Sequence, residues 1–170
     1  VGELNANKNH TQVLRALSKL RKTNFHYLIV GTGEDELKLK KMVKELSLQN
    51  KVSFLGFRKD IPELLTVSDV FILTSRREGL PKAILEAMAV GLPIIATNVR
   101  GNRDLVLNGK NGLLVSLDDV DQTATAIEQL MGSKDLRNAM GEKSKELVGQ
   151  YDLQSIIPLM ERIYNFFLAN

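Results

Sequence analysis

Short apolar segments alternate with longer helical segments along this chain, and that alternation is the feature that most limits its fold. Five segments rich in β-branched and aromatic residues predict strands, at residues 25–30, 52–55, 70–73, 94–97 and 113–115. Continuous apolar strands separated by helices are typical of a parallel sheet that is covered on both faces. The sequence therefore predicts an α/β fold with a doubly wound, mostly parallel sheet of about six strands.

The segments around these strands have helical patterns. We expect helices at residues 9–22, 35–46, 61–68, 81–89, 119–131, 133–148 and 153–168. Asp60 is placed to cap the third helix, which carries Pro62 in its first turn. The last helix has an amphipathic spacing that suits docking onto another part of a protein.

Composition fits one ordinary soluble domain over residues 1–170. Apolar residues make up 44% of the chain and charged residues 25%. The net charge of +3 is too small to indicate a nucleic-acid partner. The absence of cysteine excludes disulfides, zinc–thiolate sites and thiol catalysis. The first four residues read as the end of a strand, and the chain lacks an initiator Met. We therefore expect a piece of a longer polypeptide.

Glu78 and Glu86 are separated by seven residues. Glu78 lies in a Glu-Gly-Leu-Pro turn that opens a predicted helix, whereas Glu86 lies inside the otherwise apolar segment 83–90. A helix that is apolar all round is normally buried, and a buried carboxylate is costly without a partner. We therefore expect Glu86 to be buried and to meet either an internal donor or a polar ligand.

The predicted architecture also indicates where a ligand would bind. Ligands of open parallel sheets lie outside the carboxyl ends of the strands. The turns expected there are residues 2–9, 31–34, 56–60, 74–81 and 98–104, and four of the five have glycine near the strand end. Glycine allows close backbone approach, and the helix N-termini at such turns favour anions.

Common nucleotide and hydrolase motifs are absent. The turn Gly31-Thr32-Gly33 opens a helix after a strand, but Glu36 replaces the third glycine of the dinucleotide fingerprint. Neither a phosphate-binding P-loop nor a serine nucleophile elbow is present. Of the two histidines, His26 is expected to be structural and His10, at a helix start, to be solvated.

Several motifs together resemble the retaining glycosyltransferases of family 4. Residues 77–93 carry the paired glutamates and are similar to the signature of that family. Further matches lie at Val1-Gly2 with Lys8-Asn9, Gly31-Thr32-Gly33, residues 54–57 and residues 108–115. The resemblance covers residues 1 to about 150 and is strongest to enzymes that build bacterial capsular or extracellular polysaccharides.

This resemblance implies a GT-B enzyme, in which two Rossmann-like halves face each other across a cleft. The chain matches the C-terminal half, which binds the nucleotide-sugar donor. The missing N-terminal half would hold the saccharide or lipid-linked acceptor. The resemblance implies hexosyl transfer with no metal and no cofactor other than the donor substrate. It places the enzyme in the cytoplasm, with peripheral contact to the inner face of the membrane as a further expectation.

The resemblance also assigns roles to individual residues. Glu86 would accept hydrogen bonds from the ribose, Glu78 would contact the donor sugar as a catalytic residue, and catalytic Lys8 would neutralise the diphosphate. Backbone amides at the start of the following helix would meet the sugar or phosphate. The remaining expected donor-binding residues are Gly2, Gly33, Phe57, Arg58, Gly79, Leu80 and Pro81.

One residue departs from the family pattern, because Glu3 stands where an arginine usually follows the first glycine. Three explanations stay open. The Glu3 side chain turns away from the diphosphate, or another base such as Arg58, Arg76 or Arg77 helps to bind the diphosphate, or the geometry of the bound donor differs. Two other functions stay open: a GT-B nucleotide-sugar 2-epimerase and a non-catalytic α/β module that binds a partner. The donor base and sugar, the acceptor and the oligomeric state are not fixed by the sequence.

Overall fold

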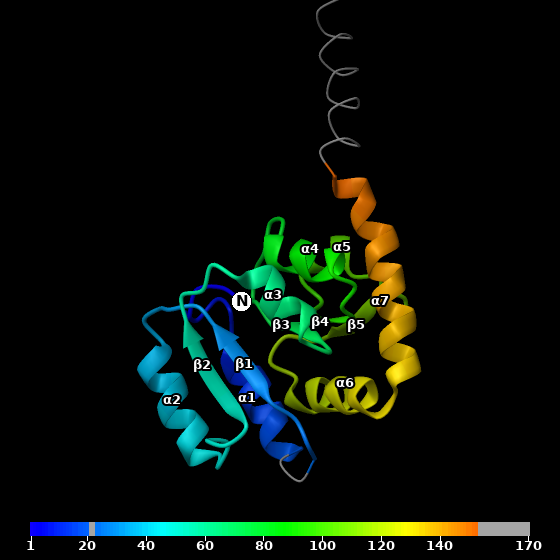
Figure 1. Ribbon diagram of the computed structural model, residues 1–170. Helices are drawn as coiled ribbons and strands as arrows, with labels where there is room; N and C mark the ends of the chain where they lie inside the picture. The colour runs from blue at the N-terminus through cyan, green and yellow to red at the C-terminus, as the bar shows by residue number, and fades with distance from the viewer. Residues whose placement is uncertain (21–22, 153–170) are drawn as a thin grey trace, which may run out of the picture.

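The structure is a computed structural model that describes residues 1–20 and 23–152, and Figure 1 shows its α/β arrangement. The strands are β1 Tyr27–Val30, β2 Val52–Gly56, β3 Phe71–Leu73, β4 Ile94–Thr97 and β5 Gly112–Val115. The α-helices are α1 His10–Lys19, α2 Glu36–Glu45, α3 Ile61–Thr66, α4 Lys82–Ala89, α5 Asn102–Leu105, α6 Val120–Gly132 and α7 Lys134–Val148. A 3-10 turn, η1 Gly149–Tyr151, ends the described part of the chain.

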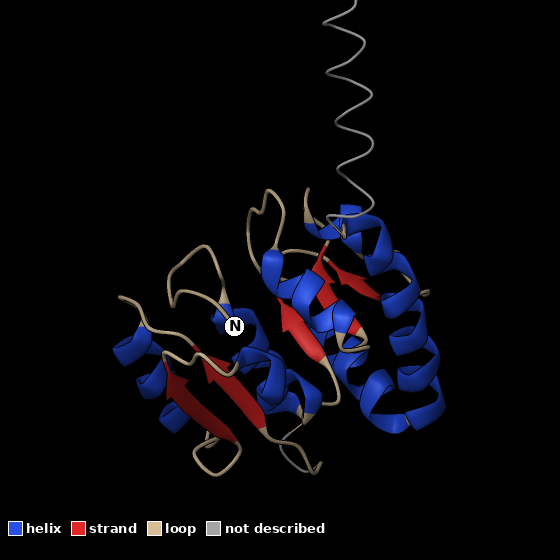
Figure 2. Cartoon of the chain, turned by 45° about the horizontal axis from the view of Figure 1, so that its top comes forward, coloured by secondary structure: helices blue, strands red, loops and turns tan. Residues whose placement is uncertain are grey.

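All strand pairs are parallel, which confirms the predicted fold class. The strands form two sheets, one in the order β1-β2 and one in the order β3-β4-β5. The described residues form five strands, close to the predicted number of about six, but in two sheets instead of one, because no ladder joins β1 to β3. In Figure 2 the five arrows point the same general way, so the carboxyl ends of all strands meet at one edge.

Alternate side chains of β4 enter different cores, which shows that this sheet is covered on both faces. Ile95 belongs to a core shared with Leu14 of α1 and Ile127 of α6. Its neighbours Ile94 and Ala96 belong to a second core, together with Ile84 and Met88 of α4. Successive side chains of a strand point to opposite faces, so two layers of helices bury the two faces of one strand.

The helix ends agree only partly with expectation. The Asp119 and Ser133 side chains cap α6 and α7 by accepting hydrogen bonds from main-chain amides three residues later. Asp60 stands at the start of α3, but its side chain does not cap the helix. It binds Arg58 instead, with Nε to Oδ1 at 2.8 Å, so the predicted cap is wrong. The short helix α5 was not expected, and the predicted helix at 153–168 lies outside the described residues.

Candidate functional site

The loop of residues 2–9 lies across the carboxyl ends of both sheets. The Gly2 amide donates to the Val30 carbonyl at 2.9 Å, and the Leu4 amide donates to Thr32 at the same distance. Gly31 has φ 134°, and a Cβ there would overlap the carbonyl oxygen of Gly2. Glycine is therefore required at Gly31 by its backbone conformation and by the close approach of two main chains.

Asn7 joins this loop to the loop that follows β3. Its side chain accepts a hydrogen bond from the Arg77 amide and donates to the Arg77 carbonyl, each at 3.1 Å. Its carbonyl also accepts from the Arg76 amide at 2.8 Å. Nearby, the Thr74 hydroxyl donates to the Asn9 carbonyl at 3.0 Å. The two loops are 70 residues apart in the sequence, and these contacts hold them in one arrangement.

That arrangement brings Lys8 and Glu78 together. Their side chains form an ion pair with Nζ to Oε1 at 2.6 Å. Both are largely shielded, with 20% of the Lys8 side chain and 12% of the Glu78 side chain exposed. Lys8 also lies over Gly2, because a Cβ added to Gly2 would be 3.1 Å from Lys8 Cε. Three residues expected in the site therefore share one small volume, in which each charge offsets the other.

The start of α4 lies beside this pair. Gly79 and Leu80 are exposed, and Pro81 precedes the first helical residue. The first amides of an α-helix have no partner within the helix, so this end is suited to an anion. Gly101, in the loop after β4, packs closely against this turn, because a Cβ added there would lie 2.7 Å from the Glu78 carbonyl oxygen.

Glu86 is exposed, so the expectation that it is buried is wrong. Its carboxylate accepts no hydrogen bond from any residue that the structure describes. Both Glu86 and Lys8 act electrostatically on the Val1 ammonium group. Burial and the Lys8 charge lower the pKa of the Val1 ammonium group to about 6, while the Glu86 carboxylate acts in the opposite direction. This unpaired acceptor near Val1 is available to the hydroxyl groups of a ligand.

The bases considered as substitutes for the missing arginine differ in their partners. Arg58 is paired with Asp60, and Arg76 makes two hydrogen bonds to Asp118, at 2.8 and 2.9 Å. Within residues 1–20 and 23–152, Arg77 forms no ion pair, which leaves its guanidinium available. Glu3 is exposed, and its carboxylate accepts a hydrogen bond from the Asn5 side chain at 3.0 Å.

The expected base-binding residues stand apart from the ion pair. Phe57 follows β2 with 74% of its surface exposed, and Arg58 beside it is exposed too. Both lie at the carboxyl edge, but on the sheet that does not carry Glu78. Gly33 packs against the main chain of Leu4, so close contact within the protein already accounts for a glycine there.

His10 is buried, so the expectation of a solvated side chain is wrong. Its Nδ1 lies 3.3 Å from the Tyr27 hydroxyl, and Nε2 has no partner within the described residues. Burial, with the positive charges of the Val1 ammonium and Lys8, lowers the pKa of His10 to about 4. His26 is exposed and bonds the Ser53 hydroxyl at 2.9 Å.

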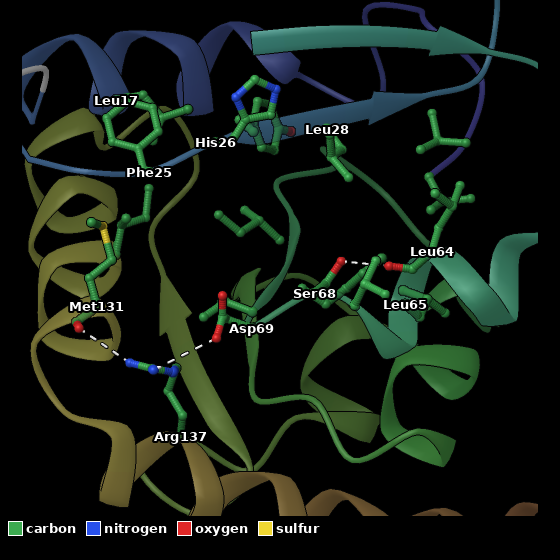
Figure 3. Close-up of a pocket in the computed structure, with 18 of the residues that line it drawn as sticks. Leu17, Phe25, His26, Leu28, Leu64, Leu65, Ser68, Asp69, Met131 and Arg137 are labelled. Carbon is green, nitrogen blue, oxygen red and sulfur yellow. Dashed lines mark hydrogen bonds and ion pairs between the residues drawn. The ribbon is translucent and has the colours of Figure 1, made fainter. Parts of the chain in front are cut away.

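Two of the cavities among the described residues are well formed, and neither of these two is lined by Lys8, Glu78 or Glu86. One, of about 420 Å³, lies on the outer side of the 2–9 loop near Arg15 and Lys38. The other, of about 460 Å³, lies between β1 and β3, and Figure 3 shows its lining. We call this second one the interstrand cavity. The carboxyl-edge site consists of Gly2, Lys8, Glu78, Gly79, Leu80 and Glu86. Of these, Gly79, Leu80 and Glu86 are exposed. No cluster of side chains in the described ranges could hold a metal ion.

Sequence reasoning found the residues that meet at this edge but missed those that hold them. Asn7 and Gly101 were not singled out, although both fix the loops that carry Lys8 and Glu78. The one local signal for Asn7 is its position in the asparagine-rich turn Asn5-Ala6-Asn7-Lys8-Asn9. Gly101 gives no signal beyond a glycine near a strand end.

Residues 1–147 match the family described as Glycosyl transferases group 1. The chain therefore belongs to that glycosyltransferase family. It is 34% identical over 146 residues to the UDP-Gal:alpha-D-GlcNAc-diphosphoundecaprenol alpha-1,3-galactosyltransferase of Escherichia coli, covering 85% of this chain and 38% of that enzyme. It is 31% identical over 157 residues to the lipopolysaccharide core biosynthesis glycosyltransferase LpsE of Rhizobium meliloti, covering 92% and 46%.

Solved structures show the same fold. The crystal structure of HepE from Anabaena in complex with UDP superposes with a TM-score of 0.87 at 25% identity, covering 99% of this chain and 47% of that one. A glycosyltransferase from Rickettsia africae superposes with a TM-score of 0.91 at 27% identity, with the same coverage. The fold is that of one half of a GT-B glycosyltransferase, which confirms the expected architecture.

The chain spans less than half the length of these relatives. These relatives are glycosyltransferases. The comparisons therefore do not favour the two alternative functions, a nucleotide-sugar 2-epimerase and a non-catalytic module that binds a partner. In the part of the chain that the structure describes, no helix has the length and hydropathy that a membrane span requires.

Proposed function

We propose that this chain is the donor-binding half of a retaining glycosyltransferase, and that its carboxyl-edge site binds a nucleoside-diphosphate sugar. The observation that carries the proposal is the shielded Lys8–Glu78 pair beside the open start of α4 and the unpaired carboxylate of Glu86. One cation, one helix N-terminus and two carboxylates match the diphosphate and the hydroxyl groups of such a donor.

Donor binding would rearrange the Lys8–Glu78 pair. The diphosphate attracts the Lys8 ammonium, so the Glu78 carboxylate is released to accept hydrogen bonds from the sugar. As the bond between the anomeric carbon and the diphosphate breaks, negative charge grows on the leaving oxygen. Lys8 and the amides at the start of α4 stabilise that charge. Glu86 accepts hydrogen bonds from the ribose, and Phe57 with Arg58 holds the base.

The site is one wall of a cleft, and the rest of the longer enzyme would supply the other. We propose that this other half binds the saccharide or lipid-linked acceptor and that transfer builds a polysaccharide or glycoconjugate. The diphospholipid named for the Escherichia coli relative supports an acceptor at the membrane surface. A cytoplasmic enzyme in peripheral contact with the membrane would meet both the donor and such an acceptor. The isolated chain would bind the donor weakly and transfer no sugar.

Calorimetry with UDP and with GDP tests the binding site. The chain should bind one of the two in a buffer without divalent metal. Glu86→Ala should weaken that binding at least tenfold, because a charge-assisted hydrogen bond contributes about 1.5–3 kcal/mol. Glu128→Ala is the matched control, since Glu128 is an exposed glutamate on α6. Equal affinity of the Glu86→Ala variant and the unchanged chain would remove Glu86 from the site.

The retaining outcome requires the full-length enzyme. NMR of the first product formed from a donor of known anomeric configuration should show the same configuration. An inverted product would reject the retaining mechanism but leave the donor site intact, because the calorimetry does not depend on it.

A further inference from the structure

A group of hydrogen-bonded side chains holds Asn9, the residue that follows Lys8. Asn9 is buried, with 6% of its surface exposed. Its backbone is left-handed, with φ 49° and ψ 41°. A residue with a side chain adopts this conformation at a cost, although asparagine tolerates it better than most residues do. The contacts that hold Asn9 therefore fix the direction of the chain at Lys8.

Three separate segments hold Asn9. Its carbonyl accepts a hydrogen bond from the Thr74 hydroxyl at 3.0 Å. Its side-chain amide donates to Gln12 Oε1 at 3.0 Å and to Asp118 Oδ1 at 3.1 Å. These partners belong to the loop after β3, the first turn of α1 and the loop after β5. The loop after β5, which no expectation included in the site, thus reaches the residue beside Lys8.

Asp118 is itself fixed in place. Its amide donates to Gln12 Oε1 at 2.8 Å, and its backbone is also left-handed, with φ 61°. Its carboxylate accepts two hydrogen bonds from the Arg76 guanidinium, at 2.8 and 2.9 Å. A cation in contact with a carboxylate offsets much of its charge at longer range. Asp118 therefore supplies an acceptor close to Lys8 with little repulsion toward a diphosphate.

The two contacts of the Asp118 carboxylate differ in burial. The pair with Arg76 lies at the surface, where 45% of the Arg76 side chain and 55% of the Asp118 side chain are exposed. The hydrogen bond to Asn9 reaches a buried side chain instead. A surface ion pair contributes little, whereas a buried amide left without its acceptor is costly. The contact with Asn9 is therefore the one expected to affect Lys8.

We propose that Asp118 is a positioning residue for Lys8. This inference rests on the proposed function, in which the Lys8 ammonium leaves Glu78 and binds the diphosphate of the donor. During that exchange the Lys8 side chain moves while its main chain stays in place, and the hydrogen bond between Asp118 and Asn9 keeps the main chain there. Asp118 contacts neither the donor nor the reacting atoms. It strengthens donor binding because a lysine held in position loses less freedom on binding.

Two substitutions at position 118 isolate this hydrogen bond. Asparagine and glycine both tolerate the left-handed backbone, and both remove the charge that pairs with Arg76. Asp118→Asn keeps an acceptor for the Asn9 amide, whereas Asp118→Gly does not. Because Asp118 is exposed, neither change should unfold the chain. In calorimetry with UDP and with GDP, Asp118→Gly should bind the preferred nucleotide about twofold to tenfold less tightly than Asp118→Asn, the effect of one hydrogen bond.

Arg76→Ala is the matched control for the ion pair. It removes the guanidinium but leaves the Asp118 carboxylate in contact with Asn9. Its nucleotide affinity should equal that of the unchanged chain. A loss as large as that of Asp118→Gly would assign the effect to the ion pair and overturn the role of the Asn9 contact.

A double-mutant cycle shows whether the effect passes through Lys8. Lys8→Met removes the ammonium group and should by itself weaken nucleotide binding. In the Lys8→Met background, Asp118→Gly and Asp118→Asn should bind equally, because the hydrogen bond no longer positions a charge. A role of Asp118 in the fold alone would instead weaken binding by the same factor with and without Lys8.

The outcomes separate this inference from the proposed function. Equal affinities of Asp118→Gly and Asp118→Asn when Lys8 is present, or the same difference when Lys8 is replaced, would overturn the role of Asp118 and leave the donor site intact. Unchanged affinity of Lys8→Met alone would overturn the contact between Lys8 and the diphosphate. The role of Asp118 would then fall with it.

Discussion

The carboxyl-edge site and the interstrand cavity differ in how their polar groups are satisfied. At the edge, Asn7 and the Lys8–Glu78 pair join loops 70 residues apart, so the charged side chains are held in place. In the interstrand cavity, the lining is a mixture of apolar side chains and polar ones such as His26, Asp69 and Arg137. Charged side chains held at the carboxyl edge suit a polar ligand that comes and goes, whereas the charged groups of the cavity, Arg137 and Asp69, already lie 3.7 Å from each other.

The largest expected effect tests how closely the main chains of Gly2 and Gly31 approach each other at the carboxyl edge. Gly31→Ala should lower the free energy of unfolding by at least about 3 kcal/mol, because the new Cβ overlaps the Gly2 carbonyl and φ is positive. Gly109→Ala is the control, with φ 76° and open space around its Cβ. It should cost only about 1–2 kcal/mol. Equal losses in urea unfolding would show that the two main chains are not in close contact.

The next effect is a dependence of stability on pH. The pKa of His10 is about 4 in the folded chain against an ordinary 6.5, so the unfolded chain binds a proton first as pH falls. This should lower the free energy of unfolding by about 3 kcal/mol between pH 6.5 and 4. His10→Asn should remove that part of the pH dependence. An unchanged slope in the variant would contradict a buried, neutral His10.

Asn7→Ala should affect both stability and binding. It removes two side-chain hydrogen bonds to the Arg77 main chain, which should cost about 1–2 kcal/mol of unfolding free energy. Because the Lys8 and Glu78 loops then separate more easily, affinity for the nucleoside diphosphate should also fall severalfold. The control is Asn138→Ala, at an exposed position on α7. A loss of stability with unchanged affinity would limit Asn7 to a structural role.

The smallest effect distinguishes two neighbouring bases. Arg76 is paired with Asp118 at the surface, so Arg76→Ala should cost about 0.5 kcal/mol of stability and leave nucleotide affinity unchanged. Arg77 forms no ion pair in the described ranges, so Arg77→Ala should weaken binding by about twofold to fivefold, because one surface charge near a diphosphate contributes under 1 kcal/mol. The reverse ranking in calorimetry would assign Arg76 to the phosphates.

Local pattern predicted the strands and the long helices, because apolar periodicity and turn residues act over short stretches. Lys8 and Glu78 were assigned to one donor site only through the family resemblance, and the structure pairs them. Local pattern was wrong for Glu86, because only Ile84, Ala87 and Met88 of α4 are fully buried, and position 86 lies on the opposite face. An apolar run in a short helix did not show which face would be covered. The roles of Asn7 and Gly101 could not be predicted, because the residues that they contact are distant in the sequence.

The most direct test of the account is a map of amide chemical shifts as UDP or GDP is added to the chain. Residues of the carboxyl-edge site, namely Gly2, Lys8, Gly79 and Glu86, should shift with the nucleotide. Leu28 and Ile72 in the interstrand cavity should not. Shifts centred on Leu28 and Ile72, with none at Lys8 or Gly79, would contradict the account and place the ligand between the sheets.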